Sequence, residues 1–478
     1  MGKDRDALAA GGPVIDPKHP MDIARELIEA HWTNDAGRLV QFWNHEFYRY
    51  RCESVFASTR VAGHWEVMDK STVKAAIWTF LDRAWAATSN DEIVRVKPNQ
   101  TMVSNVTEAL QALSHLPHTI TAPAWLADAE SRPEAISLIP CASGLLDPDT
   151  LDLIPHTPDF FALNCLTFDY EPDADDPVQW ETFLAQLWED DHECRDTLQE
   201  MFGYVLTADT SQEKIFLIEG PKRSGKGTIG RVLTALLGPE SVCGPSLSGF
   251  GERFGTECLI GKSLALVSDC RVGPKNADRL AEILLSVSGE DAITIGRKYE
   301  KDWTGRLSSR FLILTNELPS FKDAASALPS RFIIMRLFES FYDREDPDLT
   351  EKLLIELPGI LNWALEGRQR LQARGKFIQP AVGQEAMRRM EDLSAPVAAF
   401  VRDCCEVHPD GLVSKDDLWK AWAKYAEENN FRKGSKIEFG RQLRAAYPHV
   451  TDTRPGDDDR AWSHAGLALL ASQGEKSK

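Results

Sequence analysis

The sequence lacks several features that would place the chain in other classes of protein. No apolar run reaches the roughly 18 residues that a membrane-spanning helix needs, and the polar N-terminus has no signal-peptide core. The nine cysteines include no Cys-x-x-Cys pair, so neither a zinc site nor a disulfide framework is predicted. We therefore expect a protein of the reducing cytoplasm with no membrane partner.

Positive charge is also scarce. Lys and Arg number 54 against 73 Asp and Glu, which gives a net charge of −19. The surface as a whole is therefore not that of a nucleic-acid-binding protein. A basic channel or patch is still compatible with this total, because salt screens each charge beyond roughly 10 Å. In residues 395–478 basic and acidic residues balance, which hints at a different role for the C-terminus.

A phosphate-binding loop is the most informative feature that is present. The apolar run Ile215–Ile218 precedes a Gly-rich loop, and apolar residues at helical spacing follow it. The two outer glycines allow a tight loop whose backbone N–H groups approach polyphosphate, and Lys226 supplies positive charge for the outer phosphates. The helix dipole adds to this attraction. We expect the nucleotide to contact Gly220, Pro221, Lys222, Arg223, Ser224, Gly225, Lys226, Gly227 and Thr228.

The loop departs from the usual motif at one position. Gly227 follows the lysine where Ser or Thr is common, so the hydroxyl ligand of Mg²⁺ is assigned to Thr228 or replaced by water. Small nucleotide kinases share the Gly-Lys-Gly-Thr ending. The loop alone therefore predicts ATP and Mg²⁺ binding but does not separate a kinase from a motor.

Three later motifs favour a motor. An apolar strand over Ser263–Val267 ends near Asp269, which we expect to support the metal and water. The usual Asp-Glu pair is missing because Cys270 follows. The residue that activates water is therefore open among nearby acidic residues, which are Glu290, Asp291 and Glu317.

The other two motifs are an asparagine and an arginine. Phe311–Leu314 ends in Thr315-Asn316, and Asn316 is expected to sense the γ-phosphate. Arg331 precedes the strand-like Phe332–Met335 and is expected to complete the ATP site of a neighbouring subunit. An arginine finger of this kind contributes about 10³–10⁵ in rate. A surface salt bridge is the alternative role for Arg331.

Together these motifs resemble superfamily 3 helicases. The succession is Gly-x-x-x-x-Gly-Lys-Gly-Thr, Leu-Ala-Leu-Val-Ser-Asp, Phe-Leu-Ile-Leu-Thr-Asn-Glu-Leu-Pro and Ser-Arg-Phe. More narrowly, the chain is similar to the helicase part of phage and plasmid primase-helicases, which are related to the poxvirus replication ATPase. The resemblance implies an α/β AAA+-like P-loop ATPase core, homo-hexamers around DNA and 3′→5′ translocation. It also implies a bacterial cytoplasm and a gene carried by a phage or other mobile element.

A basic hairpin is predicted between the second and third motifs, over residues 296–306. Cations there are suited to phosphates and aromatic rings to stacking on bases, at about 1–3 kcal/mol per base. In the resembled family this hairpin projects into the central channel, and Lys298 best matches its DNA-contacting lysine. The alternative is a solvated turn with Trp303 packed in the core. The residues expected to contact DNA are Arg297, Lys298, Tyr299 and Lys301.

The N-terminal part reads as an α+β domain over residues 21–177 after a flexible lead-in over residues 1–20. Apolar spacing predicts a helix over Met21–Trp32 and a strand pair over Leu39–Trp43 and Phe47–Tyr50. A second helix is predicted after a Ser71 cap. Its apolar residues are Val73, Ile77, Trp78, Leu81 and Trp85.

Asp147 and Asp149 flank Pro148 and carry two interpretations. A metal-binding Asp-x-Asp pair would suit a polymerase or primase, whereas the proline favours a tight turn between strands. We favour the turn. Because the chain has no zinc module or convincing carboxylate cluster, priming is assigned to a separate primase.

The C-terminal part predicts a winged-helix domain over residues 395–470, after an ATPase domain over residues 178–375. Helices are indicated over Ser414–Glu427 and Ser435–Ala446, followed by a closing strand pair over Val450–Leu469. The second helix carries basic residues that suit DNA or a partner, although a solvated helix accounts for them equally well.

The sequence therefore predicts an ATP-dependent DNA helicase or translocase that acts in replication on single-stranded or forked DNA. A separate primase or replication initiator is an expected partner. One alternative is an AAA+ ATPase that binds DNA as an origin-binding protein or scaffold without unwinding it. The other is a small nucleotide kinase, which would leave Asn316 and Arg331 without a role.

Overall fold

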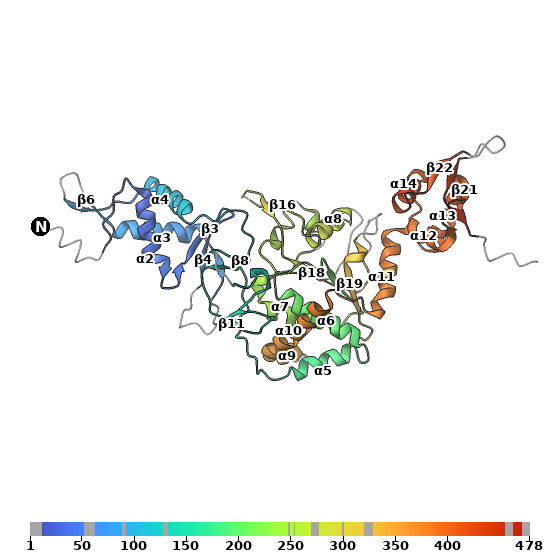
Figure 1. Ribbon diagram of the computed structural model, residues 1–478, viewed down its shortest axis with the longest axis horizontal. Helices are drawn as coiled ribbons and strands as arrows, with labels where there is room; N and C mark the ends of the chain where they lie inside the picture. The colour runs from blue at the N-terminus through green and yellow to red at the C-terminus, as the bar shows by residue number, and fades with distance from the viewer. Residues whose placement is uncertain are drawn as a thin grey trace, which may run out of the picture.

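The computed structural model gives a mixed α/β protein with N-terminal, central and C-terminal parts (Figure 1). It describes residues 12–51, 63–87, 92–127, 132–246, 249–252, 254–268, 277–298, 301–319, 328–454 and 462–470. Within these residues no helix combines the length and apolar character needed to span a bilayer.

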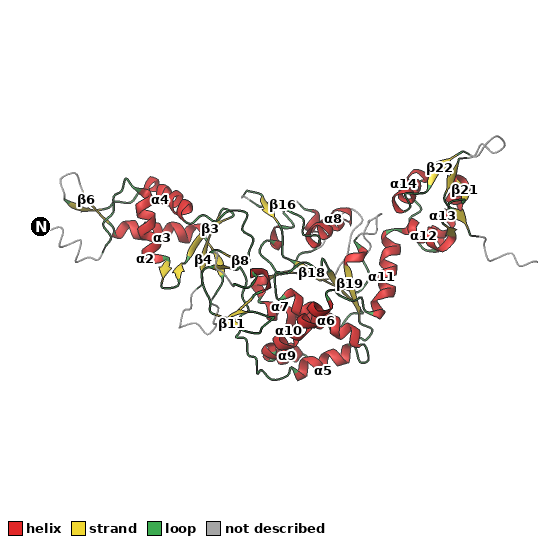
Figure 2. Cartoon of the chain, in the orientation of Figure 1, coloured by secondary structure: helices red, strands yellow, loops and turns green. Residues whose placement is uncertain are grey.

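The N-terminal part begins with helices that pack on a small antiparallel sheet (Figure 2). The helices are α2 (Pro20–His31), α3 (Lys70–Arg83) and α4 (Gln100–Leu113), and the sheet has the order β3-β4-β5. The strands are β3 (Val40–Trp43), β4 (Glu46–Tyr50) and β5 (Trp65–Met68). The predicted strand pair over 39–50 is therefore confirmed, and it turns at Asn44 and His45, which both have positive φ.

Four expectations for this part need correction. Residues 12–20 are not a loose lead-in, because Ile15 is buried and its N–H donates to the Trp85 carbonyl at 2.7 Å. Helix α3 is capped by Asp69 rather than by Ser71, and it ends before Trp85. Trp78 does not belong to the buried face of this helix, because 37% of its surface is exposed. The buried face of α3 is formed by Val73, Ile77, Phe80 and Leu81.

Further short antiparallel strands lie within the N-terminal part and between it and the central part. Asp147 and Asp149 lie between β10 and β11, and the Asp149 N–H donates to the Asp147 side chain at 2.9 Å. Asp149 also accepts a hydrogen bond from Gln372. Both aspartates thus form a turn that docks on the central part. The strands are β1 (Thr33–Asn34), β2 (Gly37–Arg38), β6 (Trp85–Ala87), β7 (Ile93–Arg95), β8 (Ala124–Trp125), β9 (Ile139–Cys141), β10 (Gly144–Leu146), β11 (Leu153–Ile154) and β12 (Phe160–Phe161).

The central part is built on a five-stranded parallel sheet with the order β14-β15-β18-β13-β19. Its strands are apolar along most of their length, as expected for a parallel sheet covered on both faces. The strands are β13 (Ile215–Glu219), β14 (Val242–Cys243), β15 (Leu264–Ser268), β18 (Arg310–Thr315) and β19 (Phe332–Arg336). All four pairings are parallel.

Parallel pairing gives the sheet two chemically distinct ends. Glu219 aligns with Thr315 and with Arg336, and these residues mark what we call the carboxyl end of the sheet. Ile215 aligns with Phe311 and with Phe332, which mark the amino end. Ligands of open parallel sheets bind at the carboxyl ends of the strands.

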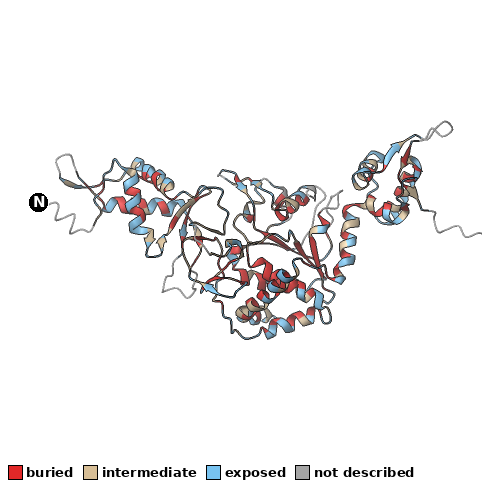
Figure 3. Cartoon of the chain, in the orientation of Figure 1, coloured by how far each residue is buried: buried red, intermediate tan, exposed pale blue. Residues whose placement is uncertain are grey.

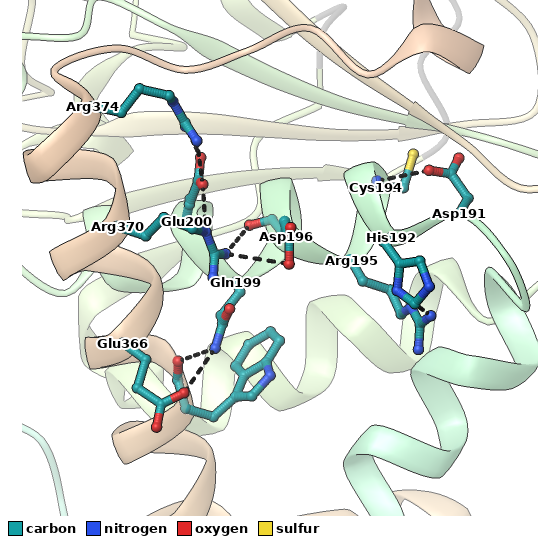
Figure 4. A network of polar contacts seen from close by, with 11 residues as sticks. Asp191, His192, Cys194, Arg195, Asp196, Gln199, Glu200, Glu366, Arg370 and Arg374 are labelled. Carbon is teal, nitrogen blue, oxygen red and sulfur yellow. Dashed lines mark hydrogen bonds and ion pairs between the residues drawn. The ribbon is translucent and has the colours of Figure 1, made fainter.

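Helices cover the sheet, and their sheet-facing sides are buried (Figure 3). Helices α6 and α10 also share a buried ion cluster (Figure 4). The Glu200 carboxylate is almost fully buried and accepts hydrogen bonds from Arg370 and from Arg374, each at 2.9 Å. The helices are α5 (Val178–Leu187), α6 (His192–Val205), α7 (Lys226–Leu237), α8 (Ala277–Ser288), α9 (Leu349–Ile355) and α10 (Leu357–Arg374).

A β-hairpin and a C-terminal part complete the described structure. The hairpin pairs β16 (Ile293–Ile295) with β17 (Trp303–Gly305). Helix α11 (Ala381–Ser394) packs against β19 and leads to the C-terminal part, whose core includes the buried Trp422 and Phe400. Its elements are α12 (Pro396–Cys404), β20 (Cys405–Glu406), β21 (Leu412–Ser414), α13 (Lys415–Glu428), α14 (Lys436–Ala446), β22 (Thr451–Thr453), β23 (Ser463–Ala465) and β24 (Ala468–Leu469).

Candidate functional site

The loop over residues 220–228 connects the carboxyl end of β13 to the first turn of α7. Arg223 has a φ of +60° and Gly225 a φ of +87°. Left-handed residues inside a tight loop turn successive backbone N–H groups toward one concave side, which suits an anion. The start of α7 adds the unpaired N–H groups and the positive dipole end of a helix.

Two glycines of the loop are required by close packing. A Cβ atom on Gly225 would lie 2.9 Å from Leu187 Cδ2, and the positive φ would strain any other residue. A Cβ atom on Gly220 would lie 2.7 Å from Leu337 Cβ. The loop is thus wedged between helix α5 and the segment that follows β19.

Lys226 is held by oxygen atoms of its own chain. Its ammonium donates to the carbonyls of Gly220 and Pro221, each at 2.7 Å. It also donates to Ser224 Oγ at 3.1 Å and to Asn316 Oδ1 at 3.2 Å. Burial lowers the pKa of this ammonium, and the nearby Glu219 carboxylate opposes that shift. The lysine therefore lies at the centre of the loop in a fixed position.

Asn316 reaches the loop because of the strand order. It directly follows β18, which pairs with β13, and the Gly220 N–H donates to the Thr315 carbonyl at 3.2 Å. The predicted Asn316 and the predicted Lys226 are therefore brought together. Asp269 lies outside the described residues, although β15 ends at Ser268 beside Leu314 of β18.

A cavity of about 860 Å³ opens beside the loop. Five cationic side chains line it, and Glu345 and Asp346 are the acidic residues of its lining. Phe183 of α5 and Phe341 supply aromatic surface. The cations are Lys222, Arg223, Lys226, Arg231 and Arg344. A space of this size with positive charge and apolar walls suits an organic anion.

Arg231 is a site residue that the sequence reasoning missed. Its guanidinium donates to Thr228 Oγ1 at 3.0 Å and to Thr350 Oγ1 at 3.1 Å. Thr228, the predicted metal ligand, is thus buried under an arginine. The i, i+3 spacing of Thr228 and Arg231 on one helix would have revealed this contact.

Arg331 lies far from this cavity. It precedes Phe332 at the amino end of the sheet, whereas the loop follows Glu219 at the carboxyl end. About six strand residues separate the two levels, which corresponds to about 20 Å. The Arg331 guanidinium donates to Glu213 Oε2 at 2.8 Å and to the Ser288 carbonyl at 3.0 Å.

The acidic residues that were candidates for activating water lie at both ends of the central sheet. Glu317 follows Asn316 at the carboxyl end. Glu290 instead accepts a hydrogen bond from Thr210 near the amino end, and Asp291 adjoins it. Neither Glu290 nor Asp291 is positioned by its own chain to activate water at the loop.

The hairpin residues have separate environments. Arg297 is largely buried, with Glu46 Oε1 at 3.8 Å and Glu257 Oε1 at 3.9 Å from its guanidinium nitrogens. Lys298 and Lys301 are exposed, and Tyr299 lies outside the described residues. Trp303 is packed in the core, which agrees with the alternative interpretation of that residue.

Comparisons with known proteins support part of this interpretation. Residues 36–189 match the family described as D5 N terminal like, and residues 218–331 match a family of unknown function, DUF5906. No curated protein is significantly similar to the chain. The first match supports a relationship of residues 36–189 to phage-type primase-helicases.

Solved structures of the C terminal region of NrS-1 are also similar. The A form apo structure has a TM-score of 0.46 and 11% identity, and the alignment covers 93% of this chain and 99% of that one. A further apo structure, of residues 305–718, has a TM-score of 0.46 and 10% identity, with coverage of 94% and 99%.

Proposed function

We propose that the chain is an ATP-dependent DNA helicase or translocase of superfamily 3 that acts in phage-type replication. The observation that carries the proposal is the placement of Lys226 and Arg331 at opposite ends of one parallel sheet. A loop that suits phosphates and an arginine about 20 Å away cannot serve one nucleotide within one chain. They fit together if the arginine of one subunit completes the site of the next.

The residues at the carboxyl end fit a bound nucleoside triphosphate. The loop N–H groups and Lys226 would hold the phosphates, and the cavity beside them is large enough for the base and sugar. Thr228 and Asp269 would hold Mg²⁺, which supplies charge neutralisation for phosphoryl transfer. The Arg231 guanidinium would have to leave the Thr228 hydroxyl for this. Asn316 would read the outer phosphate through its side-chain amide, since it already contacts Lys226.

The remaining parts follow from this arrangement. Arg331 would leave Glu213 and contact the phosphate bound by the adjacent subunit in a hexameric ring. The exposed Lys298 and Lys301 would face DNA in the channel, together with Tyr299, whereas Arg297 would have to leave Glu46 and Glu257 to do so. The order α12, β21, α13, α14, β22 and β23 supports a winged helix. Priming is assigned to a separate polypeptide.

The test uses the purified full chain with ATP, Mg²⁺ and a forked DNA duplex. We expect ATP hydrolysis that single-stranded DNA stimulates, and strand separation that requires ATP. Hydrolysis and DNA binding without strand separation would favour the origin-binding or scaffold alternative. Phosphate transfer to a nucleoside monophosphate would favour the kinase, and primers formed de novo would overturn the assignment of priming to another protein.

A further inference from the structure

We propose that the N-terminal part binds single-stranded nucleic acid in a groove beside Trp78. The groove is an open depression of about 950 Å³ between α3 and the segment from Arg95 to Pro98. It extends the proposed function to a second site on the chain. Because its test needs no ATP, this proposal and the proposed ATPase can fail separately.

The ring of Trp78 is partly exposed to solvent. All 13 tryptophans lie in the described residues, and only Trp78 and Trp462 are exposed. Trp462 already has cations of its own chain near its ring, with Lys415 Nζ at 5.2 Å and Arg454 Cζ at 5.0 Å from the ring centroid. Within the described residues Trp78 makes no such cation or ring contact. Its surface is therefore available to an external planar group.

Positive charge surrounds this ring. Arg83 and Lys97 line the groove and are exposed, and neither forms a salt bridge to any described residue. Arg95 also lines it, but Asp82 occupies its guanidinium, with a side-chain contact of 3.2 Å. The groove thus keeps two available cations on a chain whose net charge is −19. This local reversal of sign attracts polyanions.

The combination favours a single strand over other polyanions. A base can stack on Trp78 while the flanking phosphates meet Arg83 and Lys97, which is the pattern of single-strand binding without sequence preference. A duplex hides the faces of its bases and leaves only the charge contacts. An acidic peptide has carboxylates but no planar ring for the tryptophan.

The experiment measures binding of a fluorescein-labelled oligothymidylate to the full chain by anisotropy, without ATP. Trp78→Ala should weaken binding about fivefold or more, since one stacked base contributes about 1–3 kcal/mol. Trp78→Phe should restore most of it. Arg83→Glu with Lys97→Glu should weaken binding further and reduce the slope of log affinity against log salt by about 1.4.

The matched control is Lys18→Glu with Arg25→Glu, which makes the same change in charge at exposed positions of the same part. It should leave the affinity within about twofold. Circular dichroism identifies any variant that fails to fold. The wild-type chain gives a second measurement, because ultraviolet crosslinking to an iododeoxyuridine oligonucleotide should label the tryptic peptide of residues 75–83.

Several results would overturn the proposal. Affinity unchanged in Trp78→Ala together with no crosslink to residues 75–83 would exclude stacking at this groove. An equal loss of affinity in the control with Lys18→Glu and Arg25→Glu would show that the total charge of the chain, and not this groove, determines binding. Competition by polyglutamate as effective as that by unlabelled oligonucleotide would show an acidic peptide to be an equal ligand.

Discussion

The two ends of the central sheet differ in how they use their charged groups. At the carboxyl end, cations from several elements converge on one cavity, and Lys226 is held by oxygens of its own loop. At the amino end, Arg331 is held by a single carboxylate, Glu213, and by one carbonyl. The groups at the carboxyl end already surround one cavity. At the amino end, Arg331 could leave its two partners at a modest cost in free energy. The difference suggests that one chain carries two halves of different sites.

The largest expected effect concerns the amino end. Arg331→Ala should lower DNA-stimulated ATP hydrolysis by about 10³-fold or more, as for other arginine fingers. ATP affinity of the chain without its neighbour should change little, because the residue lies about 20 Å from its own loop. A time course of phosphate release measures the rate of hydrolysis, and titration with a fluorescent nucleotide measures the affinity.

Two controls separate a finger from a structural arginine. Glu213→Gln breaks the same salt bridge but keeps the arginine, so it should retain hydrolysis; the partly exposed pair contributes only about 0–1 kcal/mol. Mixing Arg331→Ala with Lys226→Ala chains should recover some activity, since mixed interfaces contain one intact site. Absence of recovery would count against action in trans.

The next effect concerns the carboxyl end. Lys226→Ala should lower hydrolysis by about 10²–10³-fold, as removal of one preorganised charge contact does. Unlike Arg331→Ala, it should also weaken nucleotide binding, because the ammonium lies inside the loop. Equal effects of the two variants on binding would erase the distinction between the two ends.

A smaller effect tests the packing of the loop. Gly225→Ala should destabilise the protein by about 1–3 kcal/mol, because it combines a positive φ with contacts to Leu187 and Phe183. Gly375→Ala is the matched control, since Gly375 has a φ of +81° but no atom within 4 Å of an added Cβ. Urea unfolding of both variants isolates the steric part. Equal losses would mean that the loop is not wedged.

The smallest effect uses a thiol toward the amino end. A hydrogen bond with Cys243 lowers the pKa of the exposed Cys258 thiol to about 7. Alkylation of Cys258 by iodoacetamide should therefore rise through pH 7 and fall below it, as the thiolate is protonated. Cys243→Ala should slow labelling at pH 7 by about tenfold. Mass spectrometry follows the labelled peptide, and equal labelling of the wild-type chain and Cys243→Ala at pH 7 would contradict the role of Cys243.

Much of the loop could be predicted from the sequence because its signals are local. The apolar strand, the glycines, Lys226 and the following helix lie within about 25 consecutive residues. The meeting of Lys226 with Asn316 needed only the general rule that strands of a parallel sheet end together. These parts depend little on long-range packing.

The parts that sequence could not give depend on strand order and on helix rotation. The placement of Arg331 follows from β19 lying beside β13, which no local pattern reveals. Trp78 was predicted among the apolar residues of this helix, yet it follows the buried Ile77 by a step of 100° around the helix, which turns it to solvent. Helices α8 and α11 were not predicted at all.

The oxygen cage around Lys226 has a consequence for how tightly any ligand is retained. An incoming phosphate must displace the carbonyls and hydroxyl that already surround the ammonium, so the lysine contributes only the difference between two sets of partners. When the ligand departs, the Lys226 ammonium can donate again to the same carbonyls. Because the Lys226 ammonium has hydrogen-bond partners both with and without the ligand, we expect rapid release of the ligand rather than tight binding.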